Sequence, residues 1–205
     1  LTAVDAALMI IDAAKGVEER TIKLMEVCRM RDTPIITFIN KMDREVREPI
    51  ALIEEIEKVL GIHCTPVTWP LGMGKSFKGV LSLADGTVLR FTPGQERADQ
   101  TFQKLASTDT REVARLVGVD PGHLMEEVEL VQSACAERNH AEFLGGKQTP
   151  VFFGSAINNF GVREILRALA EWAPPPLPRE STTRKVEPTE APFSGFVFKL
   201  QANMD

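Results

Sequence analysis

Apolar runs and helical patterns alternate through residues 1–61, and this alternation is the feature that most restricts the fold of the chain. Strands are expected over Ala6–Ile11 and Ile35–Ile39, because short apolar runs of this length are typical of buried strands. Helices are expected over Glu18–Met30 and Pro49–Leu60, and Gly61 stops the second. The order strand, helix, strand, helix implies a parallel sheet and the α/β class. The side chains expected to face the core are Ile22, Met25 and Met30 in the first helix and Ile50, Ile53, Ile56 and Leu60 in the second.

The residues that follow the second strand, Asn40, Lys41, Met42 and Asp43, match the pattern NKxD, which suits a guanine receptor. An ionised Asp43 only accepts hydrogen bonds, so its oxygens can take the ring N–H and the exocyclic amine of guanine. Adenine lacks this donor pair and would leave the carboxylate facing an acceptor. Lys41 can lay its aliphatic stem across the base with its ammonium in water, and Asn40 can tie the loop to its neighbours. A polar turn between a strand and a helix is the alternative explanation.

A second apolar run, Pro150–Phe153, ends in small residues that would let the backbone approach a ligand closely. We expect the amide N–H of Ala156 or Ile157 to face the oxygen of the base, and the Ser155 hydroxyl to orient the Asp43 carboxylate. A simple tight turn is the alternative for this loop. In parallel sheets, ligands lie outside the carboxyl ends of the strands, so the two loops are predicted to converge there.

The region between the two loops, Cys64 to Thr149, breaks the alternation and has the size of an inserted domain. A hairpin is expected over Gly79–Phe91, turning at Asp85 and Gly86, and a helical segment over Gly122–Asn139. The insertion also carries an aromatic and apolar cluster that forms either an exposed docking patch or its core, and a core is the commoner outcome. This cluster consists of Trp69, Pro70, Leu71 and Phe77, within the segment 66–80.

Beyond a helical stretch that follows Gly161 and ends at Trp172, the composition changes. Ala173–Arg179 contains four prolines and predicts a stiff linker, and Glu180–Glu190 is polar. A strand is expected over Phe193–Gln201, as the start of a second domain.

Length, charge and cysteine usage narrow the class of protein. A chain of 205 residues, 43% hydrophobic and 26% charged, suits a globular protein with a sizeable core. The formal net charge of −5 argues against a broadly basic nucleic-acid surface. The 3 cysteines form no CxxC pair and the 3 histidines lack metal-ligand spacing, so we expect reduced thiols and no metal site. No apolar stretch is long enough for a membrane span and no signal peptide is evident, so we expect a cytoplasmic location without a membrane partner.

Several strings in the chain resemble the translational GTPases. FINKMDRE, VFFGSAINNFG and AAKGV are similar to the motifs of that family, and an insertion between the two base-binding loops occurs in elongation factor G. TPVTWPLGMGKSFKGV, EWAPPPLPR and GFVFKLQANMD resemble one bacterial branch that acts in translation termination, and the similarity runs from Leu1 to Asp205. The fold implied is a P-loop-NTPase-like parallel sheet with its N-terminal part missing, an inserted α+β subdomain and the start of a β-barrel domain.

The resemblance also implies a function and a division of the chain. The parent protein would bind GTP and GDP, require Mg²⁺, hydrolyse GTP on the ribosome and promote the release of class I release factors, with the insertion facing the ribosomal stalk proteins. The chain would be an internal fragment that starts just after a switch region. The division expected is 1–63 for the guanine-binding half, 64–149 for the insertion, 150–173 for the last strand and helix, 174–191 for a linker, and 192–205 for the first barrel strand.

The phosphate-binding motif of such enzymes does not occur in the sequence. Gly74, Lys75 and Ser76 imitate the end of GxxxxGK(S/T), but Trp69 stands where the leading glycine belongs. Asp120–His123 resembles a DTPGH switch that lacks one residue, and a turn before a helix explains it better. Asp5 and Asp12 are expected to be local strand-end partners or caps and not metal ligands. We therefore predict no catalytic or metal-binding residue in this chain and no activity of the fragment alone. The alternative to a GTPase is a non-catalytic protein-interaction module on a GTPase-like scaffold.

Overall fold

The computed structural model describes residues 3–90, 102–104, 118 and 120–200. Its centre is a four-stranded parallel sheet in the order β1-β2-β8-β3. The strands are β1 (Ala7–Asp12), β2 (Ile35–Asn40), β8 (Gln148–Phe153) and β3 (His63–Pro66). The pairing is parallel throughout, with Ile35 opposite Ala7 and Thr37 opposite Val151. The α/β class and the parallel sheet predicted from the alternating pattern are confirmed.

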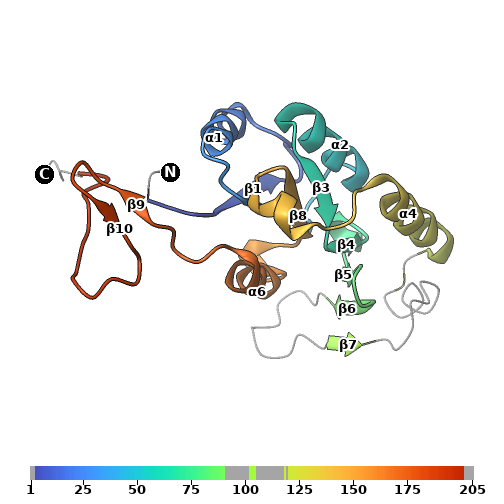
Figure 1. Ribbon diagram of the computed structural model, residues 1–205. Helices are drawn as coiled ribbons and strands as arrows, with labels where there is room; N and C mark the ends of the chain where they lie inside the picture. The colour runs from blue at the N-terminus through green and yellow to red at the C-terminus, as the bar shows by residue number, and fades with distance from the viewer. Residues whose placement is uncertain (1–2, 91–101, 105–117, 119, 201–205) are drawn as a thin grey trace, which may run out of the picture.

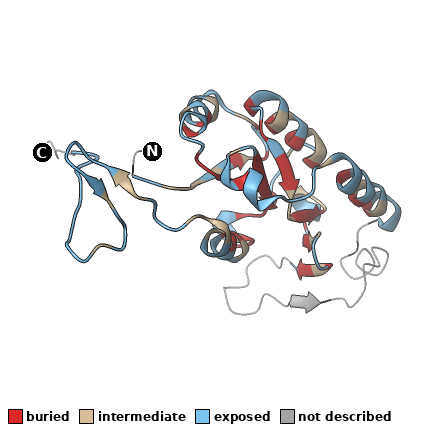
Figure 2. Cartoon of the chain, in the orientation of Figure 1, coloured by how far each residue is buried: buried red, intermediate tan, exposed pale blue. Residues whose placement is uncertain are grey.

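Helices cover both faces of this sheet (Figure 1). Side chains alternate between the faces of a strand, so every second residue of β2 enters the same cluster. Ile35 and Ile39 pack in the cluster that contains residues of α1 (Glu19–Arg29) and α2 (Pro49–Leu60). Ile36 and Phe38 pack in the cluster that contains residues of α6 (Val162–Trp172). Because both faces are covered, β2 and β8 are buried along almost their whole length (Figure 2).

Two expectations about burial near the N-terminus were wrong. The strand β1 is at the edge of the described sheet, and Leu8 and Ile10 are 40% and 55% exposed, so this strand is not buried on both faces. Met30 is 76% exposed, whereas Cys28 of α1 is buried. A helix turns by about 100° per residue, so position 28 shares the inward face of Met25 and position 30 does not. Helix α2 has the predicted bounds and ends at Gly61, which adopts a left-handed φ of 59°.

The insertion contains an antiparallel sheet in the order β4-β5-β6-β7. Its strands are β4 (Thr68–Leu71), β5 (Gly79–Ser82), β6 (Thr87–Arg90) and β7 (Phe102–Lys104). The predicted hairpin between β5 and β6 is confirmed as far as Arg90, with a left-handed Gly86 in the turn, while Phe91 lies outside the described residues. Trp69, Pro70, Leu71 and Phe77 are all buried, so this cluster is core and not a docking patch.

The strand β3 belongs to the parallel sheet. Cys64 pairs with Thr149 in the parallel sheet, although the sequence places residues 64–66 in the insertion. Four residues at the start of a Pro-rich and Gly-rich region carry too short a pattern to show which sheet they join. The expected helical segment Gly122–Asn139 is divided: α4 (Pro121–Ala134) ends at Cys135, and Asn139 caps a separate α5 (His140–Leu144). The division into domains stays a prediction.

The C-terminal segment differs from the expectation of a linker followed by a strand. A two-residue antiparallel ladder joins β9 (Arg179–Glu180) and β10 (Lys185–Val186) within the expected linker. No strand forms over Phe193–Leu200, whose side chains are exposed, and Gln201 lies outside the described residues. The expected strand is therefore wrong for these eight positions, because a strand needs a hydrogen-bonded neighbour and the described residues offer none. Among the described residues, no helix is long and apolar enough to cross a membrane.

A buried hydroxyl network joins three strands of the parallel sheet. Thr149 donates to the carbonyl oxygen of Ile35 over 2.8 Å, and its Oγ1 lies 2.7 Å from that of Thr37. Thr65 donates to the carbonyl oxygen of Thr149 over 3.3 Å. Both Thr37 and Thr149 are fully buried, so no water is available to replace a lost partner.

Replacement of Thr149 by valine keeps the shape of the side chain and removes this hydroxyl. Because Thr37 and the Ile35 carbonyl would lose a partner in the core, we expect Thr149→Val to lower the free energy of unfolding by about 1–3 kcal/mol. Urea denaturation followed by circular dichroism measures this loss. Thr183→Val, on an exposed turn, is the matched control, and equal stabilities of the two variants would contradict the assignment.

Candidate functional site

The carboxyl ends of β2 and β8 lie side by side, and the loops that follow them are joined by hydrogen bonds. We call residues 40–43 the first loop and residues 154–160 the second loop. The amide of Gly154 donates to the carbonyl oxygen of Ile39 over 3.0 Å, and the amide of Met42 donates to that of Gly154 over 3.1 Å. The amide of Ala156 donates to Oδ1 of Asn40 over 2.8 Å. The predicted convergence of the two loops is confirmed.

Asn40 connects the two loops through its side-chain carbonyl. Its Oδ1 also accepts a hydrogen bond from the amide of Lys41, over 2.8 Å, and Lys41 adopts a left-handed φ of 73°. The expectation that Asn40 ties its loop to the neighbouring loop is confirmed. The amide of Ala156 is thereby used, so Ile157 is the remaining candidate of the two to face a base oxygen. The Ile157 side chain is 74% exposed, in the short 3₁₀ turn Ala156–Asn158.

Lys41 forms an ion pair with Asp12 at the end of β1, with 2.6 Å between Nζ and Oδ2. The expected position of the ammonium in water is therefore only partly correct: the side chain is 40% exposed, but its charge is paired. Burial raises the pKa of Asp12, but the Lys41 hydrogen bond and charge and the amides of Ala14 and Lys15 outweigh burial, and the pKa lies below its ordinary value. Asp12 is a strand-end partner, as expected, whereas the partner of Asp5 is Arg179, far along the chain.

Asp43 carries the feature that points to a ligand. Its Oδ1 is buried and has no hydrogen-bond partner. A buried acceptor without a partner costs about 1–3 kcal/mol, more when it is charged, so such an atom calls for an explanation, and a bound ligand is one. A ligand that presents N–H donors at the junction of the two loops would remove this cost. The edge of guanine has two such donors, so the residues present fit the base of a guanine nucleotide.

The expected hydrogen bond between Ser155 and Asp43 is absent from the described part of the chain. Ser155 is fully buried, and its Oγ accepts a hydrogen bond from Nδ2 of Asn158 over 2.8 Å. The amide of Asn158 also donates to the Ser155 carbonyl oxygen, so the second loop closes on itself. Asn158 was missed in the sequence, although an amide side chain three residues after a serine is a common turn signal.

The motif-like segments outside the two loops do not form a phosphate site. Gly74–Ser76 is a 3₁₀ turn between two antiparallel strands, with Lys75 and Ser76 exposed, and no helix follows it. Asp120 caps α4 by accepting from the amide of Gly122, as expected of a turn before a helix. Among the described residues, no group of three or more His, Cys, Asp or Glu side chains could hold a metal ion.

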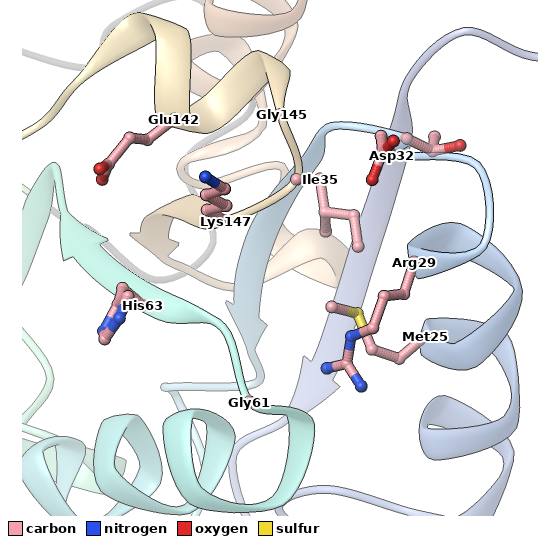
Figure 3. Close-up of a pocket in the computed structure, with 11 residues that line it drawn as sticks. Met25, Arg29, Asp32, Ile35, Gly61, His63, Glu142, Gly145 and Lys147 are labelled. Atoms are coloured by element: carbon pink, nitrogen blue, oxygen red, sulfur yellow. The ribbon is translucent and has the colours of Figure 1, made fainter.

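A cavity of about 370 Å³ lies at the opposite, amino ends of the strands (Figure 3). Ile35 and His63, the first residues of β2 and β3, line it, and the charges around it are of both signs. Arg29 and Lys147 line it together with Asp32 and Glu142, and Arg29 also donates to the carbonyl oxygen of Leu60. Ligands of parallel sheets lie at the carboxyl ends, so we do not assign the nucleotide to this cavity.

Comparison with known proteins defines the class of the chain. Residues 1–175 match the family model of the elongation factor Tu GTP binding domain, so the chain belongs to that family of GTP-binding domains of the translational GTPases. A curated relative, peptide chain release factor 3 of Aromatoleum aromaticum (strain DSM 19018 / LMG 30748 / EbN1), is 60% identical over 210 residues. The alignment covers 100% of this chain and 38% of the relative, and the resemblance found in the sequence motifs is confirmed.

A solved structure supports the fold. The crystal structure of ttk003000868 from Thermus thermophilus is similar with a TM-score of 0.59 and 22% sequence identity. The match covers 84% of this chain and 27% of that chain. At this identity the match is evidence for the fold alone.

The contact between the two loops leaves no room for a side chain at position 154. A Cβ added to Gly154 would overlap the carbonyl oxygen of Phe160 and come within 2.8 Å of the Phe38 ring. We therefore expect Gly154→Ala to lower the free energy of unfolding by about 1–3 kcal/mol, as overpacked cores do. Thermal or urea denaturation measures the change. In the control Gly195→Ala, the nearest atom to the new Cβ is 3.9 Å away, so a similar loss in both variants would contradict the explanation.

The ion pair between Asp12 and Lys41 predicts a pH dependence. The pKa of Asp12 is lowered in the folded state, so its contribution is complete above the unfolded pKa and is lost as the pH falls through the folded pKa. Asp12→Asn should cost at most about 1 kcal/mol at neutral pH, because Lys41 is substantially exposed. The difference should begin to shrink as the pH falls below about 4 and should vanish only below the lowered folded pKa. Urea unfolding across this pH range tests it. The control is Glu18→Gln, in the exposed ion pair of Glu18 with Lys15, which should show no measurable change in the free energy of unfolding. A cost of Asp12→Asn that does not vary with pH would refute the ion-pair explanation.

Proposed function

We propose that the gene product containing this chain binds GTP and GDP, hydrolyses GTP, and acts in translation termination by promoting the release of class I release factors from the ribosome. Membership of the elongation factor Tu GTP binding domain family and 60% identity to a peptide chain release factor 3 support this proposal. The chain spans 38% of the length of that relative, so the activity is proposed for the whole gene product. The single observation that carries the nucleotide assignment is the buried, unpartnered Oδ1 of Asp43.

The role proposed for this chain is selection of the guanine base. The two oxygens of Asp43 accept the ring N–H and the exocyclic amine, which adenine cannot supply together. The aliphatic stem of Lys41, fixed at its end by Asp12, covers one face of the base. The amide of Ile157 donates to the base oxygen, and Ser155 and Ala156 hold the second loop in shape through Asn158 and Asn40. Sites of this kind disfavour an analogue that lacks the donors by about 10⁴- to 10⁵-fold.

Hydrolysis itself requires groups that we do not assign within this chain. Phosphoryl transfer needs backbone amides around the phosphates, a metal ion on their oxygens and a positioned water. The described residues contain neither a cluster of potential metal ligands nor a phosphate loop, so Mg²⁺ and the phosphates are proposed to be held elsewhere in the gene product. The 205 residues alone are accordingly expected not to hydrolyse GTP.

The proposed partners are the guanine nucleotide and the ribosome, with class I release factors affected indirectly and the cytoplasm as the location. The insertion is proposed to contact the ribosomal stalk proteins. Its aromatic cluster is unavailable for this contact because Trp69 and Phe77 are buried. Any such contact would use exposed residues, such as Glu126, Glu129 and Leu130 of α4.

Replacement of Asp43 by asparagine tests the assignment of the base. The amide would present a donor to the guanine amine, so we expect Asp43→Asn to weaken GDP binding by about 10²-fold and to strengthen XDP binding, because xanthine has a carbonyl there. Fluorescence titration of GDP and XDP against the product of the complete open reading frame measures both affinities.

Asp32→Asn, the same chemical change at the opposite end of the sheet, is the control and should leave both affinities unchanged. Unchanged GDP and XDP affinities in Asp43→Asn would reject Asp43 as the base-binding group. If the unmodified gene product binds no guanine nucleotide at all, the alternative of a non-catalytic interaction module on this scaffold becomes the better explanation.

A further inference from the structure

A short turn of the insertion lies against both loops of the candidate guanine site. We call residues 72–77 the insertion turn; it connects β4 to β5 and contains the 3₁₀ helix Gly74–Ser76. The turn is hydrogen-bonded internally: Ser76 donates through both its amide and its hydroxyl to the carbonyl oxygen of Met73, over 3.1 and 2.7 Å. The amide of Lys78 donates to the carbonyl oxygen of Leu71 over 2.8 Å and closes the turn at its base.

The insertion turn contacts the first loop through Met42. The amide of Gly74 donates to the Met42 carbonyl oxygen over 2.9 Å, while the Met42 amide donates to Gly154 of the second loop. The amide and the carbonyl oxygen of Met42, the residue directly before Asp43, are therefore both hydrogen-bonded, the amide to the second loop and the carbonyl oxygen to the insertion turn. Gly74 has a left-handed φ of 59°, and a Cβ there would come within 3.3 Å of the Arg44 carbonyl oxygen. The left-handed φ favours glycine, and a Cβ at this distance would make the neighbouring backbone shift by a few tenths of an ångström.

The same turn contacts the second loop through an aromatic pair. The rings of Phe77 and Phe160 meet edge to face, with centroids 5.6 Å apart and planes at 86°. Both side chains are almost completely buried, at 3% and 1% exposure. Phe160 ends the second loop, and its backbone exchanges two hydrogen bonds with Ser155, over 3.0 and 3.1 Å. Phe77 therefore packs on the residue that closes the loop carrying Ala156 and Ile157.

The strand that precedes the insertion turn, β4, attaches the turn to the parallel sheet. β4 is attached to β8 of the parallel sheet, because the amide of Phe153 donates to Oγ1 of Thr68 over 3.1 Å. The amide of Val67 donates to the Val151 carbonyl oxygen over 2.9 Å. The turn thus has a fixed position relative to the sheet from which both loops arise.

We propose that the insertion turn, through Gly74 and Phe77, is a positioning element for base recognition: it sets the distance between Asp43 and the second loop. This inference rests on the proposed function and extends it by assigning the insertion a part in nucleotide specificity. Misplacement of Asp43 weakens the hydrogen bond to the exocyclic amine, which GDP has and IDP lacks. The ratio of GDP to IDP affinity therefore reports on the position of the carboxylate and not on the stability of the fold.

The test compares GDP and IDP binding to Phe77→Leu, Gly74→Ala and the unmodified product of the complete open reading frame, well below the unfolding temperature. Phe77→Leu removes the ring edge but keeps a large apolar side chain, and Gly74→Ala presses the turn away from Arg44. We expect each variant to lower the ratio of GDP to IDP affinity by about five- to tenfold, since a misaligned charged hydrogen bond loses much of its strength. Leu89→Ala, at a buried position of β6, is the control; it should lower the unfolding temperature without changing the ratio.

Each outcome bears on the proposal. A lowered ratio in both turn variants and an unchanged ratio in Leu89→Ala support it. An unchanged ratio in Phe77→Leu and Gly74→Ala, with the unmodified protein still preferring GDP, overturns the positioning role and leaves the proposed function intact. An unmodified protein without preference for GDP over IDP or ADP overturns the proposed function together with this inference.

Discussion

The structure of the site depends on one exchange of backbone hydrogen bonds, in which Gly154 donates to Ile39 and accepts from Met42. This exchange continues the pairing of β2 and β8 past the end of the sheet, so the two loops leave it as one unit. A side chain at position 154 would prevent it, because Phe38 and the backbone of Phe160 occupy that space. The geometry around Asp43 follows from this joint, since Met42 is the residue directly before it.

Polar groups at the ends of three strands form a connected row. Asp12 of β1 pairs with Lys41, and Asn40 of β2 accepts from the amide of Ala156 after β8. A polar network in a partly buried region stabilises one arrangement only when its members have partners. The buried Oδ1 of Asp43 is the exception in this row, because it has no hydrogen-bond partner.

The insertion is part of the architecture of the site and not an independent appendage. Its first strand, β4, follows β3 of the parallel sheet after a single residue and bonds to β8 through Thr68. Its core, with Trp69 and Phe77 buried, continues the cluster that includes Phe153 and Phe160. Because these aromatic side chains lie in one cluster, the antiparallel sheet and the second loop share a core.

The α/β class, helix α2 to the residue, the hairpin at Gly86 and the positions of both loops could be predicted from local patterns in the chain. Hydrophobic periodicity and turn residues act between near neighbours, so these features need no long-range information. The sequence also predicted that the loops converge, since all parallel strands end at the same edge. The hydrogen-bond partners could not be predicted in this way, because they come together only in the folded chain: Ser155 with Asn158, Ala156 with Asn40, and β3 with β8. The exposure of Ile10 and of Phe193–Leu200 was likewise undetermined, because an apolar residue has the same local pattern whether or not the fold brings a surface to cover it. Partners distant in the sequence meet only when the chain has folded, and their pairing depends on distances that no local pattern contains.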